Sequence, residues 1–269
     1  MTTSRITENI NQVLERGSRA VLATLVAGAQ VGAKFLIEEH GNITGSLGDS
    51  GLDEAVVHQA ITFLQSRDDA KTLKISEFAP SLNEFSDAAV LFERVEAEPR
   101  LVIAGAGHVG ASLARLAAMV GYQVILIDDR AEFVSRDLFS SSNESAIDLI
   151  AAKDWEAALG EAIGNGHGTS VAIVTRGHKQ DEDCLRAAIN SNPAYIGMIG
   201  SKRRTNIVLD KLREEGANEG QLKKVHAPIG LDIGAISPEE VALAILAEIV
   251  ADRRGGKGAS LSEWRRNPG

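Results

Sequence analysis

A glycine-rich stretch in the second half of the chain has the residue types and spacing to bind phosphate. Gly105, Gly107 and Gly110 form a GxGxxG pattern within LVIAGAGHVG, directly after an apolar run that predicts a strand. Such glycines permit a tight turn, a close backbone approach to a pyrophosphate and close packing of helix on strand. The amides and the positive dipole end of the following helix then face an anion. The pattern predicts a dinucleotide site whose loop includes His108 and Val109; a packing turn without a ligand is the alternative.

An acidic residue follows this loop at the spacing typical of dinucleotide-binding proteins. Asp128 ends the next apolar run and lies 18 residues after Gly110, close to the usual separation of about 20. Its carboxylate would accept hydrogen bonds from the adenosine ribose, which favours NAD over NADP. Arg130 could instead meet a 2′-phosphate. The sequence therefore predicts NAD(P) as the cofactor and leaves the choice between NAD and NADP open.

A second candidate anion site lies in YIGMIGSKRR, residues 195–204. Gly200 follows a predicted strand, Ser201 suits a helix N-cap, and Lys202 and Arg203 fall in the first helical turn. Cations are disfavoured at a helix start, where the dipole is already positive. A phosphate of the nucleotide or of a substrate would resolve this conflict, so these four residues are predicted to bind an anion. A solvated basic patch is the alternative.

Two histidines are candidate catalytic residues because each lies in or just after a predicted strand. His178 lies in TRGHKQDEDC, where with Asp181 and Asp183 it could move protons or bind a metal. Acidic residues at a helix start explain that segment equally well. His226 lies in the last predicted strand and Asp232 in the loop that follows it; both could face a ligand, or the loop could simply form a turn. No residues are assigned to a metal.

The elements that must position these residues predict an α/β protein. Apolar runs alternate with helical stretches, as a doubly wound, Rossmann-like parallel sheet requires; they lie at 101–105, 124–128, 146–151, 171–175, 195–199 and 225–229. A capping box at Ser237 and Glu240, with Pro238 between them, predicts the start of the last helix. We expect this domain to cover 98–254 and a flexible tail to follow at 255–269.

The first 97 residues predict a small α+β domain. Apolar spacing indicates helices within 1–19 and near 52–65, and strands at 20–27, 33–38 and 88–95. Its glycine loop, GNITGSLGDSGLDE at 41–54, also leads into a helix. Asp49, Asp53 and Glu54 add negative charge where an anion would sit, so this loop is not predicted to bind phosphate.

Composition restricts the protein classes that the chain can represent. Thirty-seven acidic and 28 basic residues give a net charge of −9, which argues against binding to nucleic acid or an anionic membrane. The apolar stretch 20–33 could pass for a signal peptide, but Glu8 and Glu15 precede it and its alternation suits a buried strand. Cys184 is the single cysteine; it excludes an internal disulfide, fits a cytoplasmic location, and is expected within a helix.

Several motifs together resemble one protein family. The run from Leu101 to Arg254 contains GAGHVG, IDDR, TRGH, YIGMIGSKRR and HAPIGLDIGAISPEE, and it is similar to the XdhC/CoxI family, the accessory proteins of xanthine dehydrogenase and related molybdenum hydroxylases. The resemblance implies a small N-terminal domain before a Rossmann domain. It also implies binding of molybdenum cofactor, promotion of its sulfuration and delivery to an apo-hydroxylase. Lys202 and Arg203 would then hold a second anion, such as the phosphate of the pterin cofactor.

The N-terminal domain departs from the family pattern. GAKF at 32–35 and GSLG at 45–48 match family stretches, but the usual GSxPR-like loop is missing and Gly51 stands where the family has a cysteine. A thiolate can ligate molybdenum or accept sulfur, and glycine can do neither. The sequence therefore predicts a divergent accessory protein, plausible as a homodimer. An NAD(P)-dependent oxidoreductase using His178 or His226, or a nucleotide-sensing regulator without turnover, is the alternative.

Overall fold

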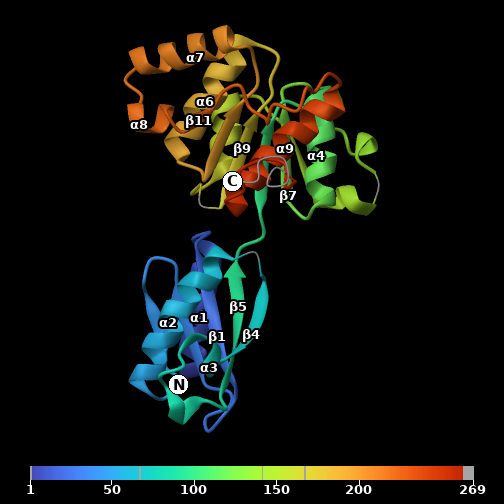
Figure 1. Ribbon diagram of the computed structural model, residues 1–269. Coiled ribbons are helices and arrows are strands. Elements are labelled where there is room, and N and C mark those ends of the chain that lie inside the picture. The colour runs from blue at the N-terminus through green and yellow to red at the C-terminus, as the bar shows by residue number, and fades with distance from the viewer. Residues whose placement is uncertain (1, 67, 141, 167, 263–269) are drawn as a thin grey trace. The chain divides into compact units, whose positions relative to one another are not determined.

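The computed structural model describes residues 2–66, 68–140, 142–166 and 168–262. The chain forms two compact units, Met1–Ala97 and Glu98–Gly269, which are coloured from blue to green and from green to red in Figure 1. Each unit has its own sheet and its own hydrophobic core. The two units are described separately below.

The first unit is a five-stranded antiparallel sheet in the order β3-β2-β1-β5-β4. Its strands are β1 Arg19–Ala27, β2 Lys34–Glu38, β3 Ile43–Gly45, β4 Ala70–Lys74 and β5 Ala89–Glu96. Its helices are α1 Thr2–Glu15, α2 Ser50–Gln65 and α3 Ile75–Phe78, with a 3-10 turn η1 at Asn83–Phe85. The edge strands β3 and β4 were not predicted, because both are short and largely exposed and so lack an apolar alternation.

Helices cover both faces of this sheet. Residues of β1 alternate between the faces, as a strand requires. Val21 and Ala23 pack in the core that includes α2, whereas Ala20 packs with Val13 of α1. Helix α2 begins where its N-cap Asp49 accepts a hydrogen bond from the Leu52 amide. The sheet is therefore sandwiched between α1 and α2.

The second unit is a six-stranded parallel sheet in the order β11-β10-β9-β6-β7-β8. Its strands are β6 Arg100–Ala104, β7 Gln123–Asp128, β8 Ile147–Ala151, β9 Thr169–Ile173, β10 Tyr195–Met198 and β11 Val225–His226. Counted from β6 as the first strand, the order is 3-2-1-4-5-6 from the β8 edge, which is typical of Rossmann folds. The predicted α/β class is thereby confirmed.

Two layers of helices cover the parallel sheet. They are α4 His108–Met119 and α9 Pro238–Arg254 on one face, and α5 Trp155–Ile163, α6 His178–Ser191, α7 Lys202–Glu214 and α8 Glu219–Leu222 on the other. Leu101 and Ile103 of β6 pack with the first pair, whereas Val102 and Ala104 pack with α5 and α6. Three 3-10 turns follow β7: η2 Ala131–Val134, η3 Arg136–Leu138 and η4 Ser142–Ala146. Near-continuous apolar strands are the consequence of burial on both faces.

In the C-terminal part, strand β11 is shorter than predicted, whereas helix α9 begins as predicted. The strand predicted at 225–229 ends at His226, before a cis Ala227–Pro228 bond. The capping box of Ser237 and Glu240 is present at the start of α9. The tail predicted at 255–269 lies outside the described residues from 263 onward. Within the described ranges, every helix falls short of the combined length and apolar character that crossing a bilayer would demand.

Candidate functional site

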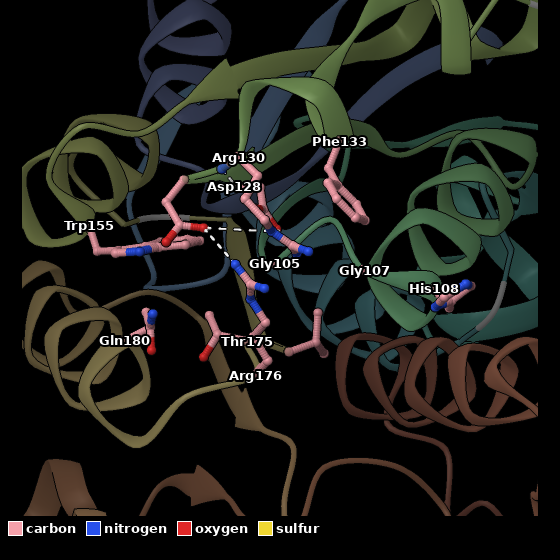
Figure 2. A pocket seen from close by; sticks show the side chains of 12 residues that line it. Gly105, Gly107, His108, Asp128, Arg130, Phe133, Trp155, Thr175, Arg176 and Gln180 are labelled. Atoms are coloured by element: carbon pink, nitrogen blue, oxygen red, sulfur yellow. Dashed lines mark hydrogen bonds and ion pairs between the residues drawn. The ribbon is translucent and has the colours of Figure 1, made fainter.

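A pocket of about 260 Å³ opens at the carboxyl ends of the central strands of the second unit. Figure 2 shows the side chains around it, which come from the loops after β6, β7 and β9 and from the starts of α4, α5 and α6. The lining residues are Gly105, Gly107, His108, Asp128, Asp129, Arg130, Phe133, Trp155, Val174, Thr175, Arg176 and Gln180. Strands β6 and β9 are neighbours, but their helices α4 and α6 cover opposite faces of the sheet. Their loops therefore diverge and leave a crevice, as at the switch point of other open α/β sheets.

The three glycines of the fingerprint have different surroundings. Gly105 has a φ of +110°, and a Cβ there would lie 2.7 Å from the Val174 carbonyl oxygen. A Cβ on Gly110 would lie 1.8 Å from the Gly105 oxygen. A Cβ on Gly107 would meet nothing within 4 Å. The packing of the protein itself thus requires glycine at 105 and 110. The space beside Gly107 is open and could admit a ligand.

The start of α4 is available to an anion. Gly107 is its N-cap and provides no side-chain hydrogen bond to the first turn. His108 is the first residue of the helix and lines the pocket. Uncapped amides at a helix N-terminus, together with the helix dipole, are a favourable site for a phosphate.

Asp128 makes hydrogen bonds within the protein itself. Its side chain is only 2% exposed. One oxygen accepts from the Arg130 amide at 3.0 Å and from Arg130 Nε at 2.8 Å; the other accepts from the Ala106 amide at 2.7 Å and from Arg130 Nη2 at 3.0 Å. A carboxylate has about four acceptor positions, and these bonds fill them. Asp128 thus holds the glycine loop through Ala106, and its binding of a ribose stays a prediction.

Arg130 is likewise committed to the protein. Burial by itself raises the pKa of Asp128, but the hydrogen bonds from Arg130 and from the Ala106 amide outweigh it and hold the pKa below its usual value. The bond to Asp128 raises the pKa of Arg130. The guanidinium carbon also lies 3.6 Å from the centre of the Phe133 ring, a cation–π contact. Arg130 is thus held by Asp128 and Phe133, and its contact with a 2′-phosphate stays a prediction.

The pocket also contains charged residues that the sequence reasoning missed. Asp129 Oδ1 lies 3.8 Å from Arg130 Nε and 3.7 Å from Arg176 Nη2, and the Asp129 side chain is 35% exposed. Figure 2 labels both arginines at the pocket, together with Trp155 and Gln180. Arg176 follows β9, which is distant in sequence from β6. Its place in the pocket depends on the pairing of these strands, so no local pattern could have indicated it.

The second predicted anion site forms a separate helix start. Gly200 has a φ of +146°, and Ser201 caps α7 by accepting from the Arg204 amide at 3.2 Å. Lys202 and Arg203 are exposed. None of the four residues Gly200 to Arg203 lines the pocket beside the glycine loop. The predicted N-cap is present, and the anion remains a prediction.

The acidic segment after β9 makes a buried link rather than a proton-moving centre. Asp181 is fully buried, accepts a hydrogen bond from the Thr175 hydroxyl, and accepts one from Arg204 Nε at 2.8 Å. Burial raises the pKa of Asp181, although both of these hydrogen bonds oppose the rise. Asp183 pairs with Arg186 at 3.1 Å. The link ties the pocket loop to the start of α7.

His178 and Cys184 have no place in the pocket lining either. His178 begins α6. Cys184 is fully buried in the same helix, as expected, and burial raises the pKa of its thiol. Among the residues that the structure describes, no group of three or more His, Cys, Asp or Glu side chains has the arrangement to hold a metal ion. The suggested grouping of His178 with Asp181 and Asp183 is thus not assembled as a metal site.

His226 belongs to a side-chain cluster outside the pocket. Its Nδ1 lies 3.2 Å from Glu248 Oε1, and its ring centre is 4.6 Å from that of Tyr195. Glu248 also accepts hydrogen bonds from the Tyr195 hydroxyl at 2.5 Å and from the Gly230 amide at 3.0 Å. Asp232 lies in the following loop, and neither His226 nor Asp232 lines the pocket. The cluster holds the loop after β11 against α9, in place of the catalytic contact predicted for His226.

The early glycine loop satisfies its own amides. Asp53 Oδ1 accepts from the Leu47 amide at 2.7 Å, Asp49 Oδ1 accepts from Leu52 at 2.9 Å, and Ser46 Oγ accepts from Gly48 at 2.9 Å. These acceptors occupy donors that an anion would need. Two of these acceptors, Asp49 and Asp53, are among the acidic residues that the sequence analysis singled out.

Comparison with known proteins shows that the chain belongs to the XdhC and CoxI family. Residues 101–249 match the XdhC Rossmann domain, and residues 13–75 match the XdhC and CoxI family model. The first match spans more than half of the chain. The resemblance inferred from the sequence motifs is thereby confirmed.

Three curated relatives show what this family contains. Uncharacterized protein YqeB of Escherichia coli K12 is 30% identical over 230 residues, 84% of this chain and 41% of that protein. A protein of Bacillus subtilis 168, named as a probable subunit of xanthine dehydrogenase, is 32% identical over 183 residues, 68% of this chain and 50% of the relative. The molybdenum cofactor insertion chaperone PaoD of Escherichia coli K12 is 27% identical over 154 residues, which are 57% of this chain and 40% of that protein. The matched regions thus span half or less of the length of these relatives.

A solved structure shares the fold over nearly the whole chain. The crystal structure described as a xanthine dehydrogenase from Bacillus halodurans covers 98% of this chain and 99% of its own, with a TM-score of 0.51 and 18% identity. At this identity the similarity concerns the fold.

Proposed function

We propose that this chain is an accessory protein for the maturation of a molybdenum hydroxylase, in which the molybdenum cofactor is cargo that it binds and hands over. The observation that carries the proposal is the family match across residues 101–249. A relative that matches 57% of this chain is named a molybdenum cofactor insertion chaperone. An apo-hydroxylase of the xanthine dehydrogenase type is the proposed partner.

In this proposal the second unit also binds a nicotinamide dinucleotide. The uncapped start of α4 would hold the pyrophosphate, and the open space beside Gly107 would let it approach the backbone. Arg176 is 60% exposed at the same pocket and offers a cation to the ligand. The dinucleotide, when bound, would supply either a hydride or a signal of redox state.

A binding role is favoured over an oxidoreductase by the position of the histidines. His178 and His226, which would move protons in an oxidoreductase, are absent from the pocket lining. His108 does line it, so turnover would require that residue. The homodimer and the cytoplasmic location stay predictions.

Activation of an apo-hydroxylase tests the accessory role. The purified chain, molybdenum cofactor and the apo-enzyme would be combined, and the rate at which hydroxylase activity appears would be compared with a reaction lacking the chain. Faster activation is expected. An unchanged rate, together with no binding of the cofactor in calorimetric titration, would reject the role.

Dinucleotide binding is tested separately with Gly107→Val. Calorimetric titration of the unchanged chain with NADH and NADPH should show binding. The valine side chain would fill the space beside the loop and should weaken binding by about 100-fold, because a pyrophosphate needs close contact with the backbone. The melting temperature should change little, since a Cβ there meets nothing. Equal affinity of the variant and the unchanged chain would place the ligand elsewhere.

A further inference from the structure

We infer that Asp129, rather than Asp128, binds the adenosine ribose and makes the pocket selective for a dinucleotide without a 2′-phosphate. The inference rests on the proposed dinucleotide site and assigns its specificity-determining residue. It moves the acidic residue of the fingerprint by one position, to 19 residues after Gly110, which also agrees with the usual spacing of about 20.

The first observation is that Asp128 has no acceptor position left. Its four hydrogen bonds come from Arg130 and from the amide of Ala106, which belongs to the glycine loop itself. A ribose could reach this buried carboxylate only by displacing Arg130. The ligand would then replace charge-assisted bonds by bonds from neutral hydroxyls, which are weaker. It would also disrupt the contact between Arg130 and Phe133.

The second observation is that Asp129 is placed and available to accept. It lines the pocket together with Gly105 and Gly107, and about a third of its side chain is exposed. Its contacts with Arg130 and Arg176 are 3.8 Å and 3.7 Å long, beyond the length of a hydrogen bond. The two arginines therefore hold the carboxylate in position without using its lone pairs in short bonds. A ribose diol could donate to it without disturbing Asp128.

The third observation concerns charge. Asp129 lines the pocket and forms ion pairs with the guanidinium groups of Arg130 and Arg176. A 2′-phosphate placed there would meet the negative charge of Asp129, whereas a neutral ribose hydroxyl would not. Without that charge, Arg176, whose side chain is 60% exposed, would face the phosphate, for which guanidinium is a preferred partner. The carboxylate therefore determines the preference between the two dinucleotides.

The test is a calorimetric titration of the full chain and of Asp129→Asn with NADH and with NADPH. The unchanged chain should bind NADH more tightly than NADPH. In Asp129→Asn the affinity for NADH should fall about tenfold, because bonds to a charged acceptor are lost. The affinity for NADPH should rise several-fold. A merely structural role of Asp129 would lower both affinities together, so opposite changes are the distinguishing result.

Two further variants complete the test. Asp137→Asn removes an exposed carboxylate outside the pocket and should leave both affinities unchanged. Asp128→Asn should weaken both dinucleotides in parallel, because it loosens the glycine loop, and its melting temperature would report any loss of folding. The inference is overturned if Asp129→Asn lowers both affinities equally or changes neither, or if Asp128→Asn alone reverses the preference. If the unchanged chain binds neither dinucleotide, the proposed site itself is rejected and this inference with it.

Discussion

The two glycine loops of this protein look alike in sequence and differ in what they leave free. The loop at 45–51 enters α2 through the N-cap Asp49, and Asp53 accepts from another loop amide. The loop at 105–110 enters α4 through Gly107, which has no side chain to place on the helix start. Glycines permit close approach in both cases. The residue at the N-cap decides whether the helix start is satisfied by the protein or remains available to a ligand.

The two loops also differ in the space beside their glycines. A Cβ on Gly45 would lie 2.4 Å from the Lys34 oxygen, and one on Gly48 would meet the Gln30 side chain. Gly45 is therefore packed against its own domain, although the first loop also lines an open hollow of about 570 Å³. Beside Gly107 there is open space that joins the pocket. The capping of the helix start is thus the clearer difference between the two loops.

The largest expected effect comes from Gly110→Ala. The new methyl group would lie 1.8 Å from the Gly105 oxygen, so the loop and α4 would have to separate. We expect the free energy of unfolding to fall by about 4 kcal/mol, at the severe end of overpacking, as measured by denaturant unfolding. Gly107→Ala is the matched control and should cost less than about 1 kcal/mol. Equal costs for the two variants would refute the difference drawn between these glycines.

Asp128→Asn should destabilise the second loop in a pH-dependent way. At neutral pH the loss of the ion pair with Arg130 should cost about 2–3 kcal/mol, less than for a fully buried pair because Arg130 is partly exposed. The folded pKa of Asp128 lies below its ordinary value of 3.8. Its stabilisation is therefore fully present above about pH 4 and is lost as the pH falls through the folded pKa.

Denaturant unfolding of the unchanged chain and of Asp128→Asn between pH 7 and pH 2.5 measures this dependence. The difference in stability should be constant near neutrality and shrink below pH 4. A difference that grew on acidification would mean that Asp128 is protonated in the folded protein. That result would contradict the interpretation that an ionised Asp128 holds the loop at 105–110.

In the first loop, Asp49→Ala should have a moderate effect. It removes the cap that accepts from the Leu52 amide at 2.9 Å, and loss of such a cap costs about 1 kcal/mol. Asp87→Ala, at an exposed position before β5, is the control and should change stability by less than about 0.5 kcal/mol. Thermal unfolding would compare the two variants. If they were equally stable, Asp49 would not close this helix start.

The smallest expected effect is that of Gly51→Ala. Gly51 is the second residue of α2, and a Cβ there would lie 3.3 Å from Asp49 Oδ1. The gain in helix propensity is about 0.5 kcal/mol, reduced by a small shift of the Asp49 side chain. Gly160→Ala in α5, where a Cβ meets nothing within 4 Å, should gain more. Denaturant unfolding would measure the free energy of unfolding of both variants. A loss of more than about 1 kcal/mol in Gly51→Ala would contradict the small effect expected at this position.

The sequence alone predicted the parts of this protein that depend on local physics. Apolar runs located the central strands β6, β7, β9 and β10, because strands buried on both faces must be apolar along their length. Apolar runs also marked the edge strands β8 and β11, although these are only partly buried. The GxGxxG loop and the capping box of α9 were visible for a similar reason, since each consists of residues within a few positions of one another. The edge strands β3 and β4 were missed, because their exposed residues carry no such pattern.

Tertiary structure decided which residues meet at the pocket. Arg176 reaches it because β9 pairs with β6, and the short final strand leaves His226 in a cluster with Glu248 outside it. The sequence showed two adjacent aspartates, Asp128 at the end of β7 and Asp129 directly after it. It did not show which of the two carboxylates has acceptor positions left for a ligand. Arg130 donates hydrogen bonds to Asp128 and packs on Phe133. These bonds occupy acceptor positions of the Asp128 carboxylate, whereas Asp129 lines the pocket. Spacing along a chain can place a carboxylate near a ligand site, but its free acceptor positions depend on neighbours that only the folded chain brings together.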